Sequence, residues 1–289
     1  MNFSLKGSIP ALVTPFHDDF SINFEKLGEL IEFQIENGSA AVLVLGTTGE
    51  SATISYEEKV EIVKYTVAKA NGRVHVMAGS GSNDTAQAVK LSQAFEELGA
   101  DSLLVVTPYY NRTNDPGMIK HYEMIANSVN IPMILYTVPP RTGCNISPAV
   151  VAHLAKHPNI VGIKDATDDF GYSMKISRYV SDDFALYTGN DNLIIPFLSI
   201  GAVGVISVIA NYKPKVVSQI VMDYAEGRYE DALKAQQENL DFISAVFVET
   251  SPIPLKYMMN KAGMNVGPAR LPLGELSDEA KVVVDGVLE

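Results

Sequence analysis

The chain has 289 residues, of which 47% are hydrophobic and 19% charged, a balance typical of a protein with a sizeable buried core. Its 34 acidic and 22 basic residues give a net charge of −12, which would repel DNA, RNA or another polyanion over most of the surface. Cys144 is the single cysteine, which excludes an internal disulfide, and we expect a cytoplasmic protein because neither a leader peptide nor a run long enough to span a membrane is evident.

Short apolar runs rich in Val, Ile and Leu recur along the chain and predict eight strands. They lack strict alternation of polar and apolar residues, so we expect them to be buried on both faces, as in a parallel sheet. The predicted strands are residues 9–13, 41–45, 74–78, 102–106, 133–136, 160–164, 185–187 and 203–208.

Segments with helical periodicity lie between these strands, for example residues 56–70, 85–98, 117–128 and 148–156. Two of them carry start signals. Ser55 with Glu58 three residues later forms a predicted capping box, and Ser147 places Pro148 at the first position of its helix. After the eighth strand the pattern is purely helical. The predicted helices there are residues 213–226, 229–248, 254–262 and 278–287.

Eight strand–helix units, each near the roughly thirty residues that a βα pair needs, favour a (β/α)8 TIM barrel, an α/β fold. We assign residues 1–212 to the barrel and residues 213–289 to a carboxy-terminal helical extension, together forming one compact unit. The alternative is an open Rossmann-like sheet. It is disfavoured because no predicted strand is followed by the three-glycine dinucleotide motif.

Active sites of such barrels lie at the carboxyl ends of the strands, and two predicted strands end in reactive side chains. Lys164 ends an apolar run, where burial would favour the neutral, nucleophilic amine that forms imines with ketones. A salt bridge to Asp165 or Asp168, or extension into solvent, is an equally good interpretation of the strand alone. Tyr136 ends the preceding strand and can transfer protons there, although a lone tyrosine at such a place is more often part of the core.

Two predicted loops offer groups that bind carboxylates. Thr47 and Thr48 lie between glycines after the second strand, where hydroxyl and amide groups could hold an anion. Taken alone, the same loop is more simply a βα turn. Arg141 follows two prolines, and its planar guanidinium suits a carboxylate, but a single arginine is usually a surface residue.

Other candidates indicate no metal or organic cofactor. The glycine-rich loop 79–83 lacks the lysine of a phosphate-binding loop, so we expect a turn. His153 and His157 have the spacing of a helical metal site without a third ligand, and a solvated helix face explains them better. We expect Cys144 to be inert.

Taken together, these residues resemble the dihydrodipicolinate synthase and N-acetylneuraminate lyase family of pyruvate-dependent barrels, from about Gly7 to the end of the chain. The segments that carry the resemblance are 45–51, 106–111, 134–136, 141–143, 162–167, 189–191, 204–208 and 252–256. The resemblance implies that Lys164 forms a Schiff base with pyruvate. It also implies that Thr48, the Ile206 backbone and Gly189 bind substrate, that Tyr136 is the main acid and base, and that Thr47 and Tyr110 complete a proton relay.

Tyr110 would act in the site of a neighbouring subunit, which predicts a homodimer or homotetramer. Residues 109–111 and 141–143 resemble the dihydrodipicolinate synthase branch more than the sialic acid lyases. That branch implies a lyase that condenses pyruvate with L-aspartate 4-semialdehyde, whose carboxylate Arg141 would bind, in lysine and diaminopimelate biosynthesis. The alternatives are an aldolase for another 2-keto acid and, less favoured, a non-catalytic binding barrel.

Four positions depart from the family pattern: Thr137 replaces Asn, Pro140 replaces Ser or Gly, Asp168 replaces Gly and Ser251 replaces Asn. Asp168 matters most, because a carboxylate facing Lys164 would favour the ammonium form. We therefore expect Asp168 to point away, to pair elsewhere, or to recognise a different substrate.

The resemblance also implies a regulatory lysine-binding pocket. Its residues would be Ser51, Ala52, Tyr56, Lys59, Asn83, Gln87 and Tyr109. Inhibited relatives tend to have His at positions 56 and 59 and Glu at position 87. Because Lys59 would repel a cationic ligand and Gln87 carries no charge to hold it, we predict weak or absent inhibition by lysine.

Overall fold

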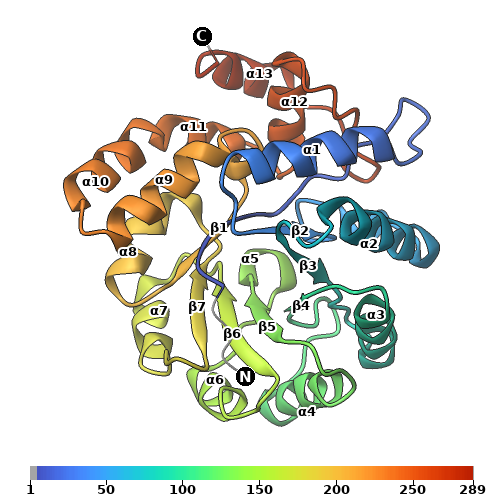
Figure 1. Cartoon of the computed structure of the whole chain (residues 1–289), viewed down its shortest axis with the longest axis vertical. Coiled ribbons are helices and arrows are strands. Elements are labelled where there is room, and N and C mark those ends of the chain that lie inside the picture. The colour runs from blue at the N-terminus through green and yellow to red at the C-terminus, as the bar shows by residue number, and fades with distance from the viewer. Residues whose placement is uncertain (1–4, 289) are drawn as a thin grey trace.

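Eight parallel strands form the centre of the molecule (Figure 1). The computed structural model describes residues 5–288. The strands are β1 (Gly7–Pro10), β2 (Ala41–Val44), β3 (His75–Gly79), β4 (Ser102–Val106), β5 (Met133–Thr137), β6 (Ile160–Asp165), β7 (Ala185–Thr188) and β8 (Gly204–Ser207). Strands β2 to β8 pair in chain order and β1 pairs with β8. A parallel bridge between Ala11 and Leu43 joins the two ends of the sheet, and the predicted barrel is confirmed.

Helices surround the strands on the outside of the barrel (Figure 1). Between the strands lie α1 (Phe24–Glu36), α2 (Tyr56–Ala70), α3 (Thr85–Glu97), α4 (Asp115–Ala126), α5 (Pro139–Thr142), α6 (Pro148–Leu154), α7 (Phe170–Ser177) and α8 (Ile194–Ser199). Both predicted start signals are confirmed. Ser55 and Glu58 form the reciprocal capping box of α2, and Ser147 caps α6 with Pro148 in its first turn.

Helices alone follow β8, and short 3-10 turns occur at Ser51–Thr53, Asp191–Leu193 and Ile209–Asn211. The helices are α9 (Pro214–Ala225), α10 (Tyr229–Glu238), α11 (Leu240–Val246), α12 (Ile253–Lys261) and α13 (Asp278–Asp285). Helix α9 packs against β1. The segment between α12 and α13 reaches the start of the chain, where Phe16 donates its N–H to the Val266 carbonyl at 3.0 Å. The division at residue 212 stays a prediction.

Two predicted boundaries were wrong because side-chain amides replace backbone partners. The first strand was predicted over residues 9–13, but β1 ends at Pro10. Beyond it, Asn211 donates to the Ala11 carbonyl at 2.8 Å and accepts the Val13 N–H at 2.9 Å. The single helix predicted over residues 229–248 is broken at Asn239, which ends α10 and precedes α11. Its side chain donates to the Ala235 carbonyl at 2.8 Å, one turn back.

The continuous apolar runs are explained by burial on both faces of each strand. One set of side chains fills the barrel interior and includes Ile134, Tyr136 and Ile206. The alternate set, including Leu103 and Leu135, packs between the barrel and the helices. This arrangement places Tyr136 and Ile206 in the same interior cluster, below the carboxyl rim of the strands.

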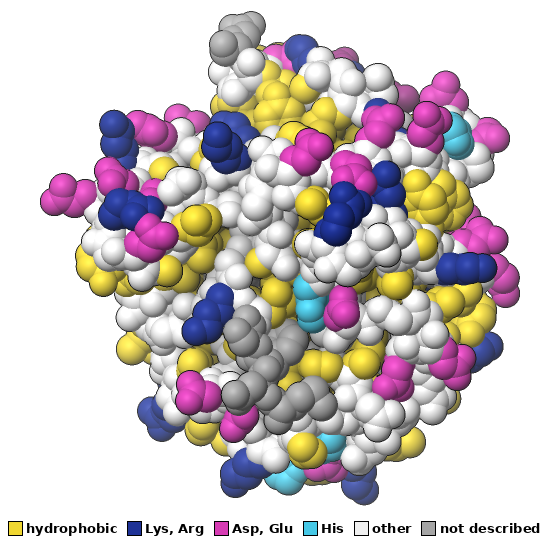
Figure 2. Space-filling view, in the orientation of Figure 1, with side chains coloured by type: hydrophobic (Ala, Val, Ile, Leu, Met, Phe, Trp, Pro, Cys, Tyr) yellow, Lys and Arg dark blue, Asp and Glu magenta, His cyan; other side chains and the backbone are white. Residues whose placement is uncertain are grey.

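The hydropathy of the helices and the charge of the surface bear on membrane and nucleic-acid binding. In the part of the chain from residue 5 to residue 288, no helix is both long and apolar enough to cross a bilayer. On the face that Figure 2 shows, Lys and Arg side chains are interspersed with Asp and Glu side chains. That face therefore carries charges of both signs and not a continuous basic patch of the kind that typically binds nucleic acid.

A buried histidine on α4 predicts a loss of stability in acid. His121 is 6% exposed, and burial lowers its pKa to about 4. The unfolded chain, with a His pKa of roughly 6.5, therefore binds more protons than the folded chain between pH 6.5 and 4, so stability falls as the pH falls through that window. Unfolding in urea at pH 7.5 and 4.5 should show that the wild type loses about 2–3 kcal/mol more than His121→Gln. Equal losses in the two proteins would contradict this prediction.

Candidate active site

Lys164 lies near the carboxyl end of β6, beside Tyr136 on β5 and Tyr187 on β7 in the strand register. Its side chain is buried, with 5% exposed. The amine nitrogen lies 4.3 Å from the centroid of the Tyr136 ring. No ion pair or hydrogen bond of Lys164 with another of residues 5–288 is found, so its amine is held inside the barrel by packing and by the aromatic face.

The two carboxylates that follow Lys164 in sequence are engaged elsewhere. Asp165 accepts hydrogen bonds from the Ser173 hydroxyl at 2.6 Å and the Thr167 N–H at 2.9 Å, and burial raises the pKa of Asp165. Asp168 is exposed and accepts a hydrogen bond from the Asn190 amide at 2.8 Å. The salt-bridged interpretation of Lys164 is therefore excluded, and Asp168 pairs elsewhere.

Gly189 lies against the stem of Lys164. A β-carbon at this position would lie 2.7 Å from Cε of the lysine, closer than two unbonded carbons can approach. The glycine N–H donates to the Asp165 carbonyl at 2.7 Å, which fixes this approach. Any larger residue would displace the lysine side chain, so Gly189 positions Lys164.

Asp191 is a further residue of this region to which the sequence assigned no role. It is fully buried, and its Oδ2 accepts the N–H groups of Val208 at 2.9 Å and Ile209 at 3.1 Å. Burial raises its pKa. These bonds fix the chain immediately after Ile206, the residue predicted to hold substrate. In the sequence, Asp191 could have been noticed as a carboxylate in a short polar segment after a buried strand. Its hydrogen-bond donors, however, lie seventeen or more residues further along the chain.

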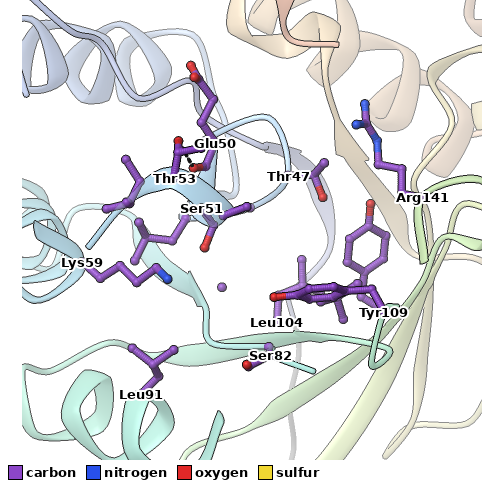
Figure 3. Close-up of a pocket in the computed structure, with 18 of the residues that line it drawn as sticks. Thr47, Glu50, Ser51, Thr53, Lys59, Ser82, Leu91, Leu104, Tyr109 and Arg141 are labelled. Carbon is purple, nitrogen blue, oxygen red and sulfur yellow. Dashed lines mark hydrogen bonds between the residues drawn. The ribbon is translucent and has the colours of Figure 1, made fainter. Parts of the chain in front are cut away.

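A cavity of about 530 Å³ opens beside Tyr136. Thr47, Tyr136 and Arg141 line one part of it, and most of the predicted lysine pocket lines the rest. Those pocket residues are Ser51, Ala52, Tyr56, Lys59, Gln87 and Tyr109. Figure 3 shows Thr47 and Arg141 at one end and Lys59 extending into the other. Thr47, Tyr136 and Arg141 of the predicted catalytic site thus share one cavity with most of the predicted lysine pocket, whereas Lys164, Gly189 and Ile206 lie outside its lining.

The remaining predicted residues lie outside this lining. Thr48 is buried, with 4% exposed. Asn83 contributes its carbonyl to the Asn111 side-chain amide at 3.0 Å. Tyr110 points away from the barrel, with 92% of its surface exposed and a left-handed φ of 67°. Within one subunit, therefore, Tyr110 does not contact the site to which the sequence assigned it.

Arg141 is held by the loop before α12. It lies on α5, which begins with two prolines, and it donates a hydrogen bond to the Ser251 carbonyl at 2.8 Å. This single bond leaves the other N–H donors of the guanidinium without a partner among residues 5–288, and Arg141 lines the cavity. The arginine is thereby suited to bind a carboxylate.

Glu50 anchors the loop that carries Thr47 and Thr48. It has a left-handed φ of 57° and pairs with Lys256 on α12, with an N–O distance of 2.5 Å. Both side chains are almost fully buried, and the second Glu50 oxygen accepts the Arg270 N–H at 2.8 Å. Burial lowers the pKa of Lys256 to about 8 even though Glu50 opposes that shift. Both residues belong to segments that carry the family resemblance, but no spacing in the sequence pairs them.

The other candidate ligands have partners on α4 or nearby. His153 contacts the Glu123 carboxylate at 2.9 Å and His157 contacts the Asn127 side chain at 3.0 Å. The Cys144 thiol donates to the Pro108 carbonyl at 3.1 Å. Among the described residues, no group of three or more His, Cys, Asp or Glu side chains is placed to hold a metal ion.

This arrangement agrees with comparisons to known proteins. The dihydrodipicolinate synthetase family model matches residues 4–289. The chain belongs to this family. A 4-hydroxy-tetrahydrodipicolinate synthase from Thermoanaerobacter sp. strain X514 is 46% identical over 284 residues, covering 98% of this chain and 95% of that protein.

Solved structures of family members are equally similar in fold. A dihydrodipicolinate synthase (DHDPS) from Acinetobacter baumannii complexed with pyruvate has a TM-score of 0.96 at 36% identity, covering 99% of this chain and 98% of that one. A DHDPS from Cyanidioschyzon merolae with lysine bound has a TM-score of 0.95 at 35% identity, covering 98% and 97%.

The other departures from the family pattern are accommodated locally. Thr137 is fully buried at the end of β5 and donates to the Asn145 side chain at 2.6 Å. Pro140 lies in the first turn of α5. Ser251 is buried and lines the cavity, and its hydroxyl has no hydrogen-bond partner within residues 5–288.

The buried Glu50–Lys256 pair predicts a strong effect of removing one partner. Lys256→Met should lower the free energy of unfolding by about 3–5 kcal/mol, because it leaves the Glu50 carboxylate buried without a counterion. The double variant Glu50→Gln/Lys256→Met should recover most of this loss. Urea unfolding measures both, and Lys261→Met, which removes the exposed pair with Asp285 from the same helix, is the matched control. A loss no larger than that of the control would contradict the prediction.

Proposed function

We propose that this chain is a Schiff-base lyase, a 4-hydroxy-tetrahydrodipicolinate synthase, that condenses pyruvate with L-aspartate 4-semialdehyde. The names of its relatives support the reaction, and the pyruvate complex of the Acinetobacter baumannii enzyme supports the first substrate. The observation that carries the proposal is the buried amine of Lys164, which has no carboxylate partner and lies over Tyr136. The pathway is lysine and diaminopimelate biosynthesis, and the expected location is the cytoplasm.

The reaction begins with attack of the Lys164 amine on the ketone carbon of pyruvate. The resulting carbinolamine loses water to give an imine, and removal of a methyl proton gives an enamine. The enamine carbon attacks the aldehyde carbon of the second substrate. The amino group of that substrate then displaces Lys164 from the imine carbon, which closes the ring and frees the enzyme.

The family resemblance implies a role for each surrounding residue in these steps. Thr48 and the backbone of Ile206 hold the pyruvate. Tyr136 transfers protons to and from the carbinolamine, and Thr47 and Tyr110 connect it to solvent. Arg141 binds the carboxylate of the semialdehyde. Gly189 leaves room for the Lys164 stem, which its contact with Cε supports.

The alternative of an aldolase for another 2-keto acid rested on Asp168. Asp168 accepts a hydrogen bond from Asn190 at the surface. This carboxylate therefore gives no reason to propose a different substrate. A turnover assay with a sugar-derived aldehyde in place of the semialdehyde separates the two reactions.

Turnover of pyruvate and aspartate semialdehyde tests the proposed function. Lys164→Arg should lower kcat by roughly 1,000-fold or more, because a guanidinium does not form the imine. Arg141→Met should lower kcat/KM for the semialdehyde roughly 10- to 100-fold through the loss of a charged contact, with little change in KM for pyruvate. Lys175→Arg, a change at an exposed residue of α7, is the control. Full activity of Lys164→Arg would refute the proposal.

Self-association completes the proposed site. The exposure of Tyr110, at 92%, supports a role in a neighbouring subunit, and we propose a homodimer or homotetramer on this basis.

Mixing two impaired variants tests this arrangement. Tyr110→Phe and Lys164→Arg should each have low activity, and unfolding and refolding them together should restore part of it. Mixed assemblies would contain sites with Lys164 from one chain and Tyr110 from the other. If the refolded mixture is no more active than the separate variants, Tyr110 does not act between subunits.

The far end of the cavity is proposed as the regulatory pocket, with weak or absent inhibition by lysine. Lysine is bound in the Cyanidioschyzon merolae structure, whereas here Lys59 would repel the ammonium groups of such a ligand. Gln87 has no charge to compensate for this repulsion.

A further inference from the structure

An unpaired cation lies at the far end of the cavity. Lys59, the fourth residue of α2, lines the cavity and extends into it (Figure 3). It forms no ion pair with any other described residue, and partial burial lowers its pKa. A cation removed from water without a counterion destabilises the free protein, so the position of Lys59 is suited to a bound anion.

The polar groups around Lys59 offer mainly hydrogen-bond donors. The Ser82 hydroxyl donates to the Gln87 side-chain oxygen at 2.7 Å, which leaves the NH2 group of Gln87 for a ligand. Ser51 and Tyr109 also line this end, and Figure 3 shows them around the same space as Lys59. An acceptor ligand matches this set better than a donor such as an ammonium group.

Negative charge near this end is already neutralised. Glu50, the acidic residue that lines the cavity, is paired with Lys256. Glu58 is bound by Arg270. A second cation, Lys90, lies outside the cavity lining, 4.1 Å from the centroid of the Tyr56 ring. Among the described residues that line the cavity, Lys59 and Arg141 are thus the charged side chains without an ion pair, in a chain of net charge −12.

The cavity also has apolar walls. Ile54, Leu91 and Leu104 line it together with Lys59, so the space accepts a short apolar body behind the charged group. We infer that the Lys59 end of the cavity binds a small organic monocarboxylate, with its carboxylate on Lys59 and Gln87. This inference names the class of ligand for the proposed regulatory pocket. It rests on the proposed function only for the catalytic role of the other end of the cavity, where Thr47 and Arg141 lie.

Calorimetric titration with ligands that differ only in charge tests the inference. Butanoate and butylammonium share an apolar body, and L-lysine is a third probe. The active end is first blocked by reduction of the pyruvate imine with borohydride. We expect butanoate to bind the blocked protein, and butylammonium and L-lysine to bind roughly 10-fold more weakly or not at all. Preference for either cation would overturn the inference.

Variants locate the bound anion. Lys59→Met should weaken butanoate binding roughly 10-fold or more, Lys59→Arg should retain it, and Lys90→Met, which removes the outer cation, should change it little. Equal binding to wild type and Lys59→Met, or loss of binding in Lys59→Arg when that variant is folded, would overturn the inference. If pyruvate forms no adduct, the proposed function fails. Butanoate binding can then still be compared between untreated wild type and Lys59→Met, and this comparison decides whether Lys59 binds the anion.

Discussion

The proposed Schiff-base chemistry depends on the burial of one amine at the carboxyl rim of a closed barrel. Parallel pairing fixes Lys164 beside Tyr136 and Tyr187, and Gly189 provides the space for its stem. The amine faces the Tyr136 ring and forms no ion pair with Asp165 or Asp168, because these carboxylates bond to other groups. The buried Asp191 is the carboxylate that interacts electrostatically with Lys164, and this interaction favours the ionised form of Asp191.

The helices after β8 support the site from outside the barrel. Lys256 on α12 reaches the loop between β2 and α2 through its buried pair with Glu50. Lys256 and Arg270 both lie over the ring of Phe16, with centroid distances of 4.3 and 4.4 Å. Ser251, just before α12, holds Arg141. The loop of Thr47 and the loop of Arg141 are thus both positioned by the carboxy-terminal segment.

Local patterns predicted the fold well because strands and caps depend on neighbouring residues. The runs that became β2 to β8 are apolar on both faces, and Ser55 with Glu58 marks the start of α2. Long-range contacts were not predictable in this way. Asn211 lies 200 residues from Ala11, whose carbonyl it binds. The break at Asn239 depends on a side-chain bond that competes with an otherwise good helical pattern.

The same distinction holds for the site. Lys164, Tyr136 and Thr47 were predicted as site residues because each ends a predicted strand or belongs to the loop after one. The roles of Glu50 and Asp191 depend on partners that no spacing reveals, namely Lys256 and the N–H groups after β8. That one cavity joins Thr47 to Lys59 follows only from three-dimensional packing.

Trapping the covalent intermediate tests the central claim most directly. The protein is incubated with pyruvate and sodium borohydride, and intact mass followed by peptide mapping locates any adduct. We expect a mass increase of one pyruvate, less one water and plus two hydrogens, on the peptide that contains Lys164. The Lys164→Arg variant should show no such increase. An unmodified protein, or an adduct on a different lysine, would contradict the claim that this buried amine is the nucleophile.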